Sequence, residues 1–308
     1  MRSGRDGAQV NGILLLDKPL GATSNHALQR AKRLLGGAKA GHTGTLDPLA
    51  SGLLPICFGE ATKFSQSLLD SEKRYQAHVR LGWRSSTGDA EGELTSVSEP
   101  RFTDAQLTAT LEEFTGEISQ VPPMYSALKR QGKPLYELAR QGQTVHRDPR
   151  TVVISRLNLL SHEGDLLVLD VACSKGTYVR VLAEGIGDAL GCGAYLQGLR
   201  RTAVAGFGLE RSVTFEQMEA MDSDALINLL LPVDAMLSSL PMLILGDIEA
   251  QRMRLGQASS VAAASAEPGV VRLYGPEEAF LGVGEIRDDG LLHPKRLVSQ
   301  AFAQSVSP

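Results

Sequence analysis

The sequence has few cysteines, no long apolar runs and none of the common cofactor motifs, and each shortage excludes a class of protein. Its three cysteines among 308 residues form no Cys-x-x-Cys pair, which argues against a disulfide framework or a cysteine zinc site. The longest apolar runs are far shorter than the roughly 20 residues of a membrane-spanning helix. The charged N-terminus also lacks the apolar stretch of a signal peptide. We therefore expect a cytoplasmic protein that does not enter a membrane.

Motifs that bind phosphate, dinucleotides or metal ions are absent as well. The segment Ser174-Lys-Gly-Thr177 lacks the glycine frame of a P-loop, and Ser51 lacks the G-x-S-x-G frame of a hydrolase. No G-x-G-x-x-G follows a predicted strand. None of the six histidines pairs with another at metal-ligand spacing. The sequence therefore predicts a site that works without a cofactor or a metal.

Charge is distributed unevenly along the chain, although the net charge is only −4. Residues 1–40 and 123–156 each carry seven Lys/Arg against two Asp/Glu, whereas residues 215–250 carry seven acids and no Lys or Arg. This asymmetry is compatible with a basic face for phosphates beside an acidic face that does not meet them. An ordinary solvated surface of mixed charge explains it equally well.

Hydrophobic periodicity and capping signals predict one large domain and a smaller one, both built from strands and helices. In the first we expect strands at 12–16, 75–82, 151–160 and 165–173, and helices from Thr23-Ser24 to Gly36, at 103–114, at 177–190 and from Thr214 onward. Segment 83–100 is loop-like, and 117–150 is expected to be a surface excursion with at most a short helix at 134–141. Beyond Pro241 a β-rich module is expected, with strands at 242–245, 269–274, 279–287 and 295–299 and a helix at 247–255.

The stretch from Gly41 to Pro55 is the most informative part of the sequence. It places the carboxylate of Asp47 in a segment so rich in Gly, Thr and Pro that neither helix nor strand interior is expected there. Pro48 biases Asp47 toward an extended conformation. Such a loop either presents its acid to a ligand or forms an Asp-Pro turn, in which the carboxylate bonds only to its own backbone.

Two tyrosines and an arginine are further candidates for a site. Tyr75 opens a predicted strand and Tyr178 a predicted helix, so both side chains could point into a cleft, although an isolated tyrosine is more often a core or rim residue. Arg180 lies near the start of a helix, where the helix dipole slightly disfavours a cation. Its partner is either Glu184 at i+4 or a carboxylate from elsewhere, such as Asp47.

Taken together, these segments closely resemble the TruB-type tRNA pseudouridine synthases. The resemblance spans about residues 12–202, with the motifs in the order of the family. It is carried by Leu14-Leu-Leu-Asp-Lys18-Pro-x-Gly-x-Thr-Ser24, Gly41 to Pro55, Lys73-Arg-Tyr75, Leu81-Gly82 with Thr87-Gly-Asp89, Pro122-Pro-Met-Tyr-Ser-Ala-Leu-Lys129, Ser174-Lys-Gly-Thr-Tyr178-Val-Arg180 and Leu199-Arg-Arg-Thr202. The strand-rich C-terminal module is similar to the PUA-like domain of these enzymes.

The resemblance implies an α+β pseudouridine synthase fold, with a mixed, largely antiparallel central sheet flanked by helices, plus a small β-rich PUA-like domain. Residues 1–240 would form the catalytic domain, with a basic RNA-contacting insertion at about 123–151, and residues 241–308 the RNA-binding domain. The implied activity is isomerisation of uridine 55 in the T-loop of tRNA, by base flipping and Asp-dependent breaking and remaking of the glycosidic bond. A monomer would bind the T-stem-loop. The alternative is a non-catalytic protein that binds or folds tRNA, which would not need the acid.

Three residues would carry the chemistry by this resemblance. Asp47 would be the nucleophile, and Arg180 would be its partner because an unpaired carboxylate is costly to bury. Tyr75 would stack on the flipped base and relay a proton when C5 loses its hydrogen. No metal and no cofactor are implied.

Other residues would bind the substrate by the same resemblance. Tyr178 would form part of the pocket wall, Leu199 would line the uracil pocket, and His42 would lie near the position that the flipped base vacates. Contacts to the RNA backbone, which position the RNA without reading its sequence, are expected from Lys18, Lys129, Lys133, Arg140, Arg200 and Arg201.

Overall fold

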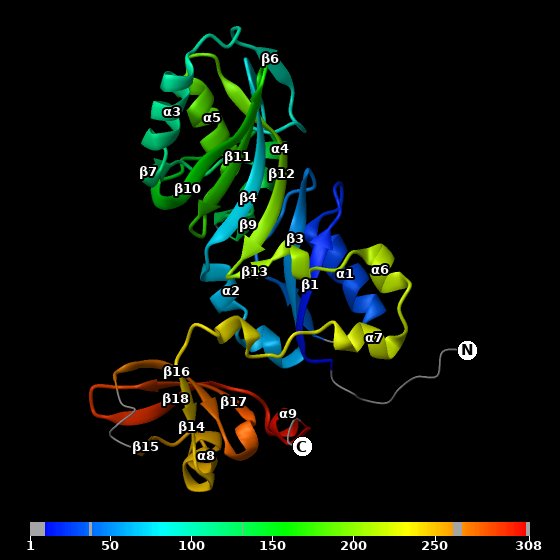
Figure 1. Ribbon diagram of the computed structural model, residues 1–308, viewed down its shortest axis with the longest axis vertical. Helices are drawn as coiled ribbons and strands as arrows, with labels where there is room; N and C mark the ends of the chain where they lie inside the picture. The colour runs from blue at the N-terminus through cyan, green and yellow to red at the C-terminus, as the bar shows by residue number, and fades with distance from the viewer. Residues whose placement is uncertain (1–9, 37–38, 131, 261–266, 306–308) are drawn as a thin grey trace.

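A nine-stranded sheet forms the centre of the larger part of the chain (Figure 1). The computed structural model describes residues 10–36, 39–130, 132–260 and 267–305. The strands of this sheet are β1 (Gly12–Lys18), β2 (Ala40–His42), β3 (Ala50–Phe58), β4 (Lys73–Leu81), β7 (Gly116–Gln120), β10 (Arg150–Glu163), β11 (Leu166–Cys173), β12 (Ala194–Val204) and β13 (Phe207–Gly208). They are ordered β1-β3-β12-β4-β11-β10-β7, with β2 beside β3 and β13 beside β12. Since β3 and β12 run parallel and the other pairs antiparallel, the prediction of a mixed, largely antiparallel sheet is confirmed.

Helices pack against this sheet through two hydrophobic clusters. One cluster joins α3 and α5 to β4, β10 and β11, and the other joins α1 and α6 to β1 and β3. The helices are α1 (Ser24–Leu34), α2 (Gln66–Asp70), α3 (Asp104–Glu113), α4 (Leu135–Arg140), α5 (Val179–Ala189), α6 (Phe215–Glu219) and α7 (Ser223–Asn228), with short 3₁₀ turns η1 (Gly59–Lys63), η2 (Leu209–Arg211) and η3 (Ala235–Leu237). The predicted capping boxes at Thr103 and Thr214 are present. Of the helices in the described ranges, none is long and apolar enough to cross a membrane.

The C-terminal module is a five-stranded sheet that packs against the rest of the chain. It contains β14 (Met242–Ile244), α8 (Asp247–Arg254), β15 (Ser259–Ser260), β16 (Gly269–Tyr274), η5 (Pro276–Glu278), β17 (Phe280–Ile286), β18 (Leu291–Leu297) and α9 (Gln300–Ser305). One hydrophobic cluster includes Tyr274 and Phe280 of the module together with Phe64 and Met236 of the larger part. The rings of Phe64 and Phe280 meet edge to face, with centroids 5.6 Å apart. The module is therefore joined to the larger part by a shared core as well as by the chain.

Four sequence predictions about local structure are wrong. The surface excursion expected at 117–150 begins instead with β7, which pairs with β10 at the edge of the central sheet. Residues 50–55 are strand, because Gly52 adopts φ +99° and lies so close to the backbone of Arg201 that its lack of a side chain permits the parallel pairing of β3 with β12. Segment 83–100 contains a short hairpin of β5 (Trp83–Ser85) and β6 (Leu94–Ser96). The last strand of the module begins at Leu291 and not at 295.

Candidate active site

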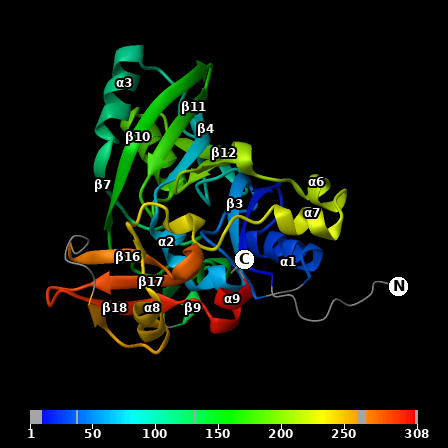
Figure 2. The same ribbon diagram turned by 60° about the horizontal axis from the view of Figure 1, so that its bottom comes forward.

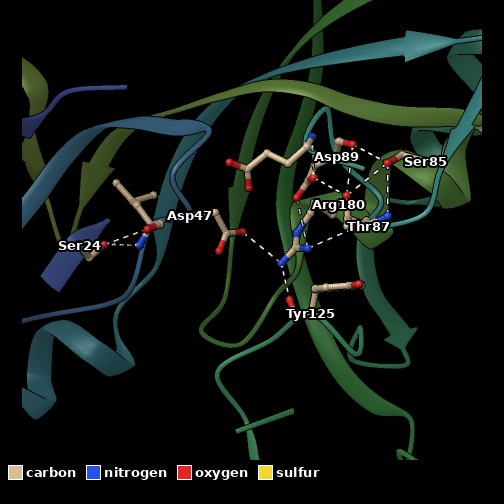
Figure 3. A network of polar contacts seen from close by, with 9 residues as sticks. Ser24, Asp47, Ser85, Thr87, Asp89, Tyr125 and Arg180 are labelled. Atoms are coloured by element: carbon tan, nitrogen blue, oxygen red, sulfur yellow. Dashed lines mark hydrogen bonds and ion pairs between the residues drawn. The ribbon is translucent and has the colours of Figure 1, made fainter. Parts of the chain in front are cut away.

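Asp47 lies in the connection between β2 and β3, as predicted for the middle of the glycine-rich stretch. Leu46, the residue before Asp47, fixes this connection through two hydrogen bonds between its backbone and Ser24. The buried hydroxyl of Ser24 donates to the carbonyl of Leu46 at 2.9 Å and accepts from the amide of Leu46 at 2.8 Å (Figure 3). Ser24 is the first residue of α1, so the start of a helix holds in place the loop around Asp47, residues 43–49, which we call the acid loop.

A cavity of about 300 Å³ opens beside Asp47 and collects the other candidates from separate elements. Its lining includes Tyr75 from β4, Tyr178 and Arg180 from the start of α5, and Leu199 from β12. The sheet brings them together, since Leu199 lies opposite Ala50 of β3 on one side and Ala77 of β4 on the other. Five of the residues singled out in the sequence thus share one cavity.

Arg180 joins two carboxylates that are distant in sequence. Its guanidinium, in a residue only 6% exposed, lies 3.1 Å from Oδ2 of Asp47 and 3.3 Å from Oδ2 of Asp89 (Figure 3). It also donates to the carbonyls of Thr87 at 3.0 Å and Tyr125 at 2.7 Å. Of the two partners considered from the sequence, the distant Asp47 is therefore the one with which Arg180 forms the ion pair.

Asp89 is a member of this network to which the sequence analysis assigned no role. Its side chain is almost fully buried, accepts from the hydroxyl of Thr87 at 2.6 Å, and accepts from the amide of Glu91 at 3.1 Å. Its place after Gly88 in the motif Thr87-Gly-Asp89 was a signal, because glycine is the usual residue where a turn needs positive φ, and Gly88 has φ +77°. Asp89 pairs with Nη1 of Arg180, whereas Asp47 pairs with Nη2.

The surroundings of the cavity shift several pKa values. Burial raises the pKa of Asp47, and the Arg180 guanidinium opposes this shift. Burial also raises the pKa of Tyr75, with Arg201 acting in the opposite direction. The pKa of His42 is lowered by burial and by Arg201. Asp47 is therefore an acid that Arg180 helps to keep ionised, and Tyr75 and His42 favour their neutral forms.

The substrate-binding candidates differ in how they are placed. Tyr178 is the N-cap residue of α5, its backbone exchanges hydrogen bonds with the Gln120 side chain at 3.0 and 3.3 Å, and its ring lies 4.9 Å from the guanidinium carbon of Arg150. Leu199 lines the cavity directly. His42 lies on β2 and is not part of the cavity lining, and its Nδ1 is buried without a hydrogen-bond partner among the residues that the structure describes.

Two of the predicted phosphate contacts are wrong, because their side chains are inside the protein. Lys18 is fully buried and donates to the carbonyls of Pro19 at 3.0 Å and Ala22 at 2.6 Å. Burial, with Arg201 nearby, lowers the pKa of Lys18 to about 8. Arg201 is 1% exposed and donates to the carbonyls of Leu53 at 2.6 Å and Gly44 at 3.1 Å. Arg201 contributes to the lining of the cavity, whereas Lys18 does not, and neither presents its charge to bulk solvent.

The other predicted phosphate contacts are accessible. Lys129 on β8 (Lys129–Arg130), Lys133 on β9 (Lys133–Pro134) and Arg140 at the end of α4 are exposed. Arg200 is half-buried and pairs with Asp17 at 2.6 Å. Within the ranges that the structure describes, no three His, Cys, Asp or Glu side chains gather closely enough to hold a metal ion.

We expect Ser24→Ala to disturb the acid loop. The change removes both bonds to Leu46 and leaves a buried amide without a partner, which costs about 1–3 kcal/mol of unfolding free energy. Thr23→Ala is the matched control, because it removes the cap of the same helix, at a cost of about 1 kcal/mol, without touching the loop. Thermal melts and turnover of both variants test this, and equal turnover losses would contradict the role of Ser24.

Comparison with known proteins agrees with this geometry. Residues 32–179 match the TruB family pseudouridylate synthase N-terminal domain, residues 180–238 the tRNA pseudouridylate synthase B C-terminal domain, and residues 241–298 the C-terminal domain of pseudouridine synthase II TruB. The tRNA pseudouridine synthase B of Dechloromonas aromatica (strain RCB) is 55% identical over 95% of this chain and 97% of its own length. The enzyme of the same name from Burkholderia mallei (strain NCTC 10247) is 53% identical over 94% of this chain and 97% of its own length.

Solved structures have the same fold. A crystal structure of a Cbf5-Nop10-Gar1 complex contains a chain that is 25% identical, with a TM-score of 0.71 over 96% of this chain and 87% of that one. The archaeal box H/ACA sRNP Nop10-Cbf5 complex gives a TM-score of 0.70 at 23% identity, over 96% of this chain and 88% of that one. The family models and the sequence relatives show that the chain belongs to the TruB family of pseudouridine synthases.

Proposed function

We propose that this chain isomerises uridine 55 in the T-loop of tRNA to pseudouridine. The observation that carries the proposal is the Asp47 carboxylate, ion-paired to the buried Arg180 at a cavity large enough for a base. The tRNA substrate is supported by relatives named tRNA pseudouridine synthase B at 53–55% identity over nearly the whole chain.

The reaction requires no external reactant. The bond from N1 of uracil to C1′ of the ribose breaks, the base turns within the pocket, and a bond forms between C5 and C1′. The proton from C5 leaves to solvent, and N1 gains a proton. Uridine and pseudouridine are isomers, so atoms and electrons balance without an oxidant or a reductant.

The residues around the cavity have distinct tasks in this proposal. Asp47 supplies the carboxylate on which bond breaking depends, and Arg180 keeps it ionised. Tyr75, whose pKa is raised by burial, is protonated at the start, stacks on the base and relays the C5 proton by passing its own hydroxyl proton toward solvent as it accepts that one. Tyr178 and Leu199 form walls that hold the base. We further propose that His42, outside the cavity lining, lies near the position that the flipped base leaves.

The exposed basic side chains serve RNA binding. Lys129, Lys133 and Arg140 lie in the segment 123–151, which we propose contacts the phosphate backbone of the T-stem-loop. Arg200 is the fourth candidate and must loosen its pair with Asp17 to reach a phosphate. One chain supplies every residue of the site, so we propose that the protein acts as a monomer.

The test of the proposed function is release of tritium from C5-labelled uridine in a T-stem-loop RNA. We expect one tritium released per RNA, and none when the label is confined to uridines outside position 55. Binding without release would instead indicate the alternative function, a non-catalytic protein that binds or folds tRNA.

We also propose that residues 1–240 carry the chemistry and that 241–308 dock whole tRNA. Deleting the chain from Pro241 onward should raise KM for full-length tRNA more than it lowers kcat, and should affect an isolated T-stem-loop less. The deletion also removes Tyr274 and Phe280 from the shared core, so a lower melting temperature is expected. Circular dichroism must establish a folded core before the kinetics are compared. Equal losses on both RNAs would contradict the docking role.

A further inference from the structure

Lys73 is a buried lysine in the cavity wall that the proposed chemistry does not use. It is the first residue of β4, two positions before Tyr75, and is 7% exposed. Its side chain also contributes to the lining of the cavity. A lysine is rarely buried to this extent unless its charge is compensated, so its contacts must offset the loss of hydration.

The ammonium of Lys73 meets three backbone carbonyls at the end of α2. Nζ donates to the carbonyl oxygens of Leu68 at 2.9 Å, Leu69 at 2.6 Å and Ser71 at 2.6 Å. Carbonyls in the last turn of a helix lack intrahelical partners, and the helix dipole favours a cation there. An ammonium has three hydrogens, so these bonds use all of its donors. None is left for a phosphate or a base.

The helix that Lys73 holds connects the C-terminal module to the cavity. Figures 1 and 2 both place α2 between the central sheet and this module. On the side toward the module, Leu68 belongs to the core that the two parts share, and Ser67 donates at 3.2 Å to the carbonyl of Met236, a residue of the larger part in that same core. On the cavity side, Leu69 lines the cavity, and Asp70 pairs at 3.0 Å with Lys175, which lines it as well.

We propose that Lys73 is a positioning residue that fixes the end of α2 to the strand that carries Tyr75. It thereby holds Leu69, which forms part of the cavity wall, in place relative to Asp47. This inference rests on the proposed function. Since Lys73 has no free donor for RNA, its loss should act on kcat and leave KM for the T-stem-loop nearly unchanged. Burial, with Arg201 as a second cause, lowers the pKa of Lys73 to about 8, which agrees with a lysine enclosed by protein.

Lys73→Met tests the proposal, because methionine fills similar space without the ammonium. We expect kcat for the T-stem-loop to fall about ten- to a hundredfold, the size of effect that a small misplacement of reacting groups produces. Lys63→Met is the matched control: Lys63 donates to the carbonyl of Leu297 at 3.2 Å, pairs with Glu60 and does not line the cavity. Its kcat should stay within about threefold of the wild type. Both are assayed at a temperature where circular dichroism shows full folding.

Lys73→Arg decides the outcome if the methionine variant does not fold. Arginine keeps the charge, but its planar guanidinium cannot meet three carbonyls grouped around one nitrogen, so we expect a kcat between those of wild type and Lys73→Met. An unchanged kcat in a folded Lys73→Arg or Lys73→Met variant would overturn the proposal, as would a rise in KM with kcat unchanged. An inactive wild type would instead refute the proposed function, so the two failures are distinguishable.

Discussion

Asp47→Asn is expected to lower turnover by at least about a thousandfold while RNA binding persists. Asparagine has nearly the same size and keeps the loop that Ser24 anchors through Leu46, but it cannot act as a charged nucleophile. Affinity should survive because phosphate contacts such as Lys129 and Lys133 lie elsewhere on the surface. Single-turnover tritium release and a filter-binding titration separate the two effects.

Asp165→Asn is the matched control for this prediction. Asp165 also pairs its carboxylate with an arginine, Arg80, but it lies in the turn between β10 and β11 and does not line the cavity. Its turnover should equal that of the wild type. If Asp47→Asn turned over within tenfold of the wild type, Asp47 would not be the nucleophile.

The sequence predicts the acid loop well because the relevant information is local. Gly, Thr and Pro around Asp47 exclude regular structure at positions 43–49, and the structure has neither helix nor strand there. For residues 50–55 the same composition wrongly predicts that there is no strand. There Gly52 serves a close approach to Arg201 on β12, a partner about 150 residues away that local composition does not reveal.

Burial of charge is the property that the sequence predicts least well. Lys18 and Arg201 were expected, following the family resemblance, to contact phosphates at the surface, yet both are used inside to satisfy carbonyls. From the sequence, the partner of Arg180 was either Glu184 or a distant carboxylate such as Asp47. In the structure Arg180 pairs with Asp47 and also with a second carboxylate, Asp89, which was not anticipated. Such networks depend on side chains from the β5–β6 connection, α5 and the acid loop meeting in space, and no spacing along the chain encodes that meeting.

Arg180→Met is expected to lower turnover by about a hundred- to a thousandfold, because it removes the fixed positive charge beside the reacting carboxylate. It should also destabilise the fold by about 3 kcal/mol, since Asp89 is left almost fully buried without its counter-charge. Arg74→Met is the control. Arg74 neighbours Tyr75 on β4 but pairs with Asp170 on the other side of the strand, at 2.6–2.7 Å, and does not line the cavity.

The pH dependence distinguishes loss of charge from loss of structure in Arg180→Met. Burial already raises the pKa of Asp47 in the wild type, and the proposed chemistry needs its carboxylate form, so activity should fall as the pH is lowered through that raised pKa. Arg180 is the main factor opposing the shift, so its removal should raise the pKa of Asp47 further. The residual activity of the variant should therefore have its acidic limb at higher pH than that of the wild type and of Arg74→Met. A profile of kcat measured between pH 5 and 9 distinguishes loss of charge from loss of structure. A variant that is only partly folded would lose activity equally at every pH, and the acidic limb of its profile would stay where it is in the wild type.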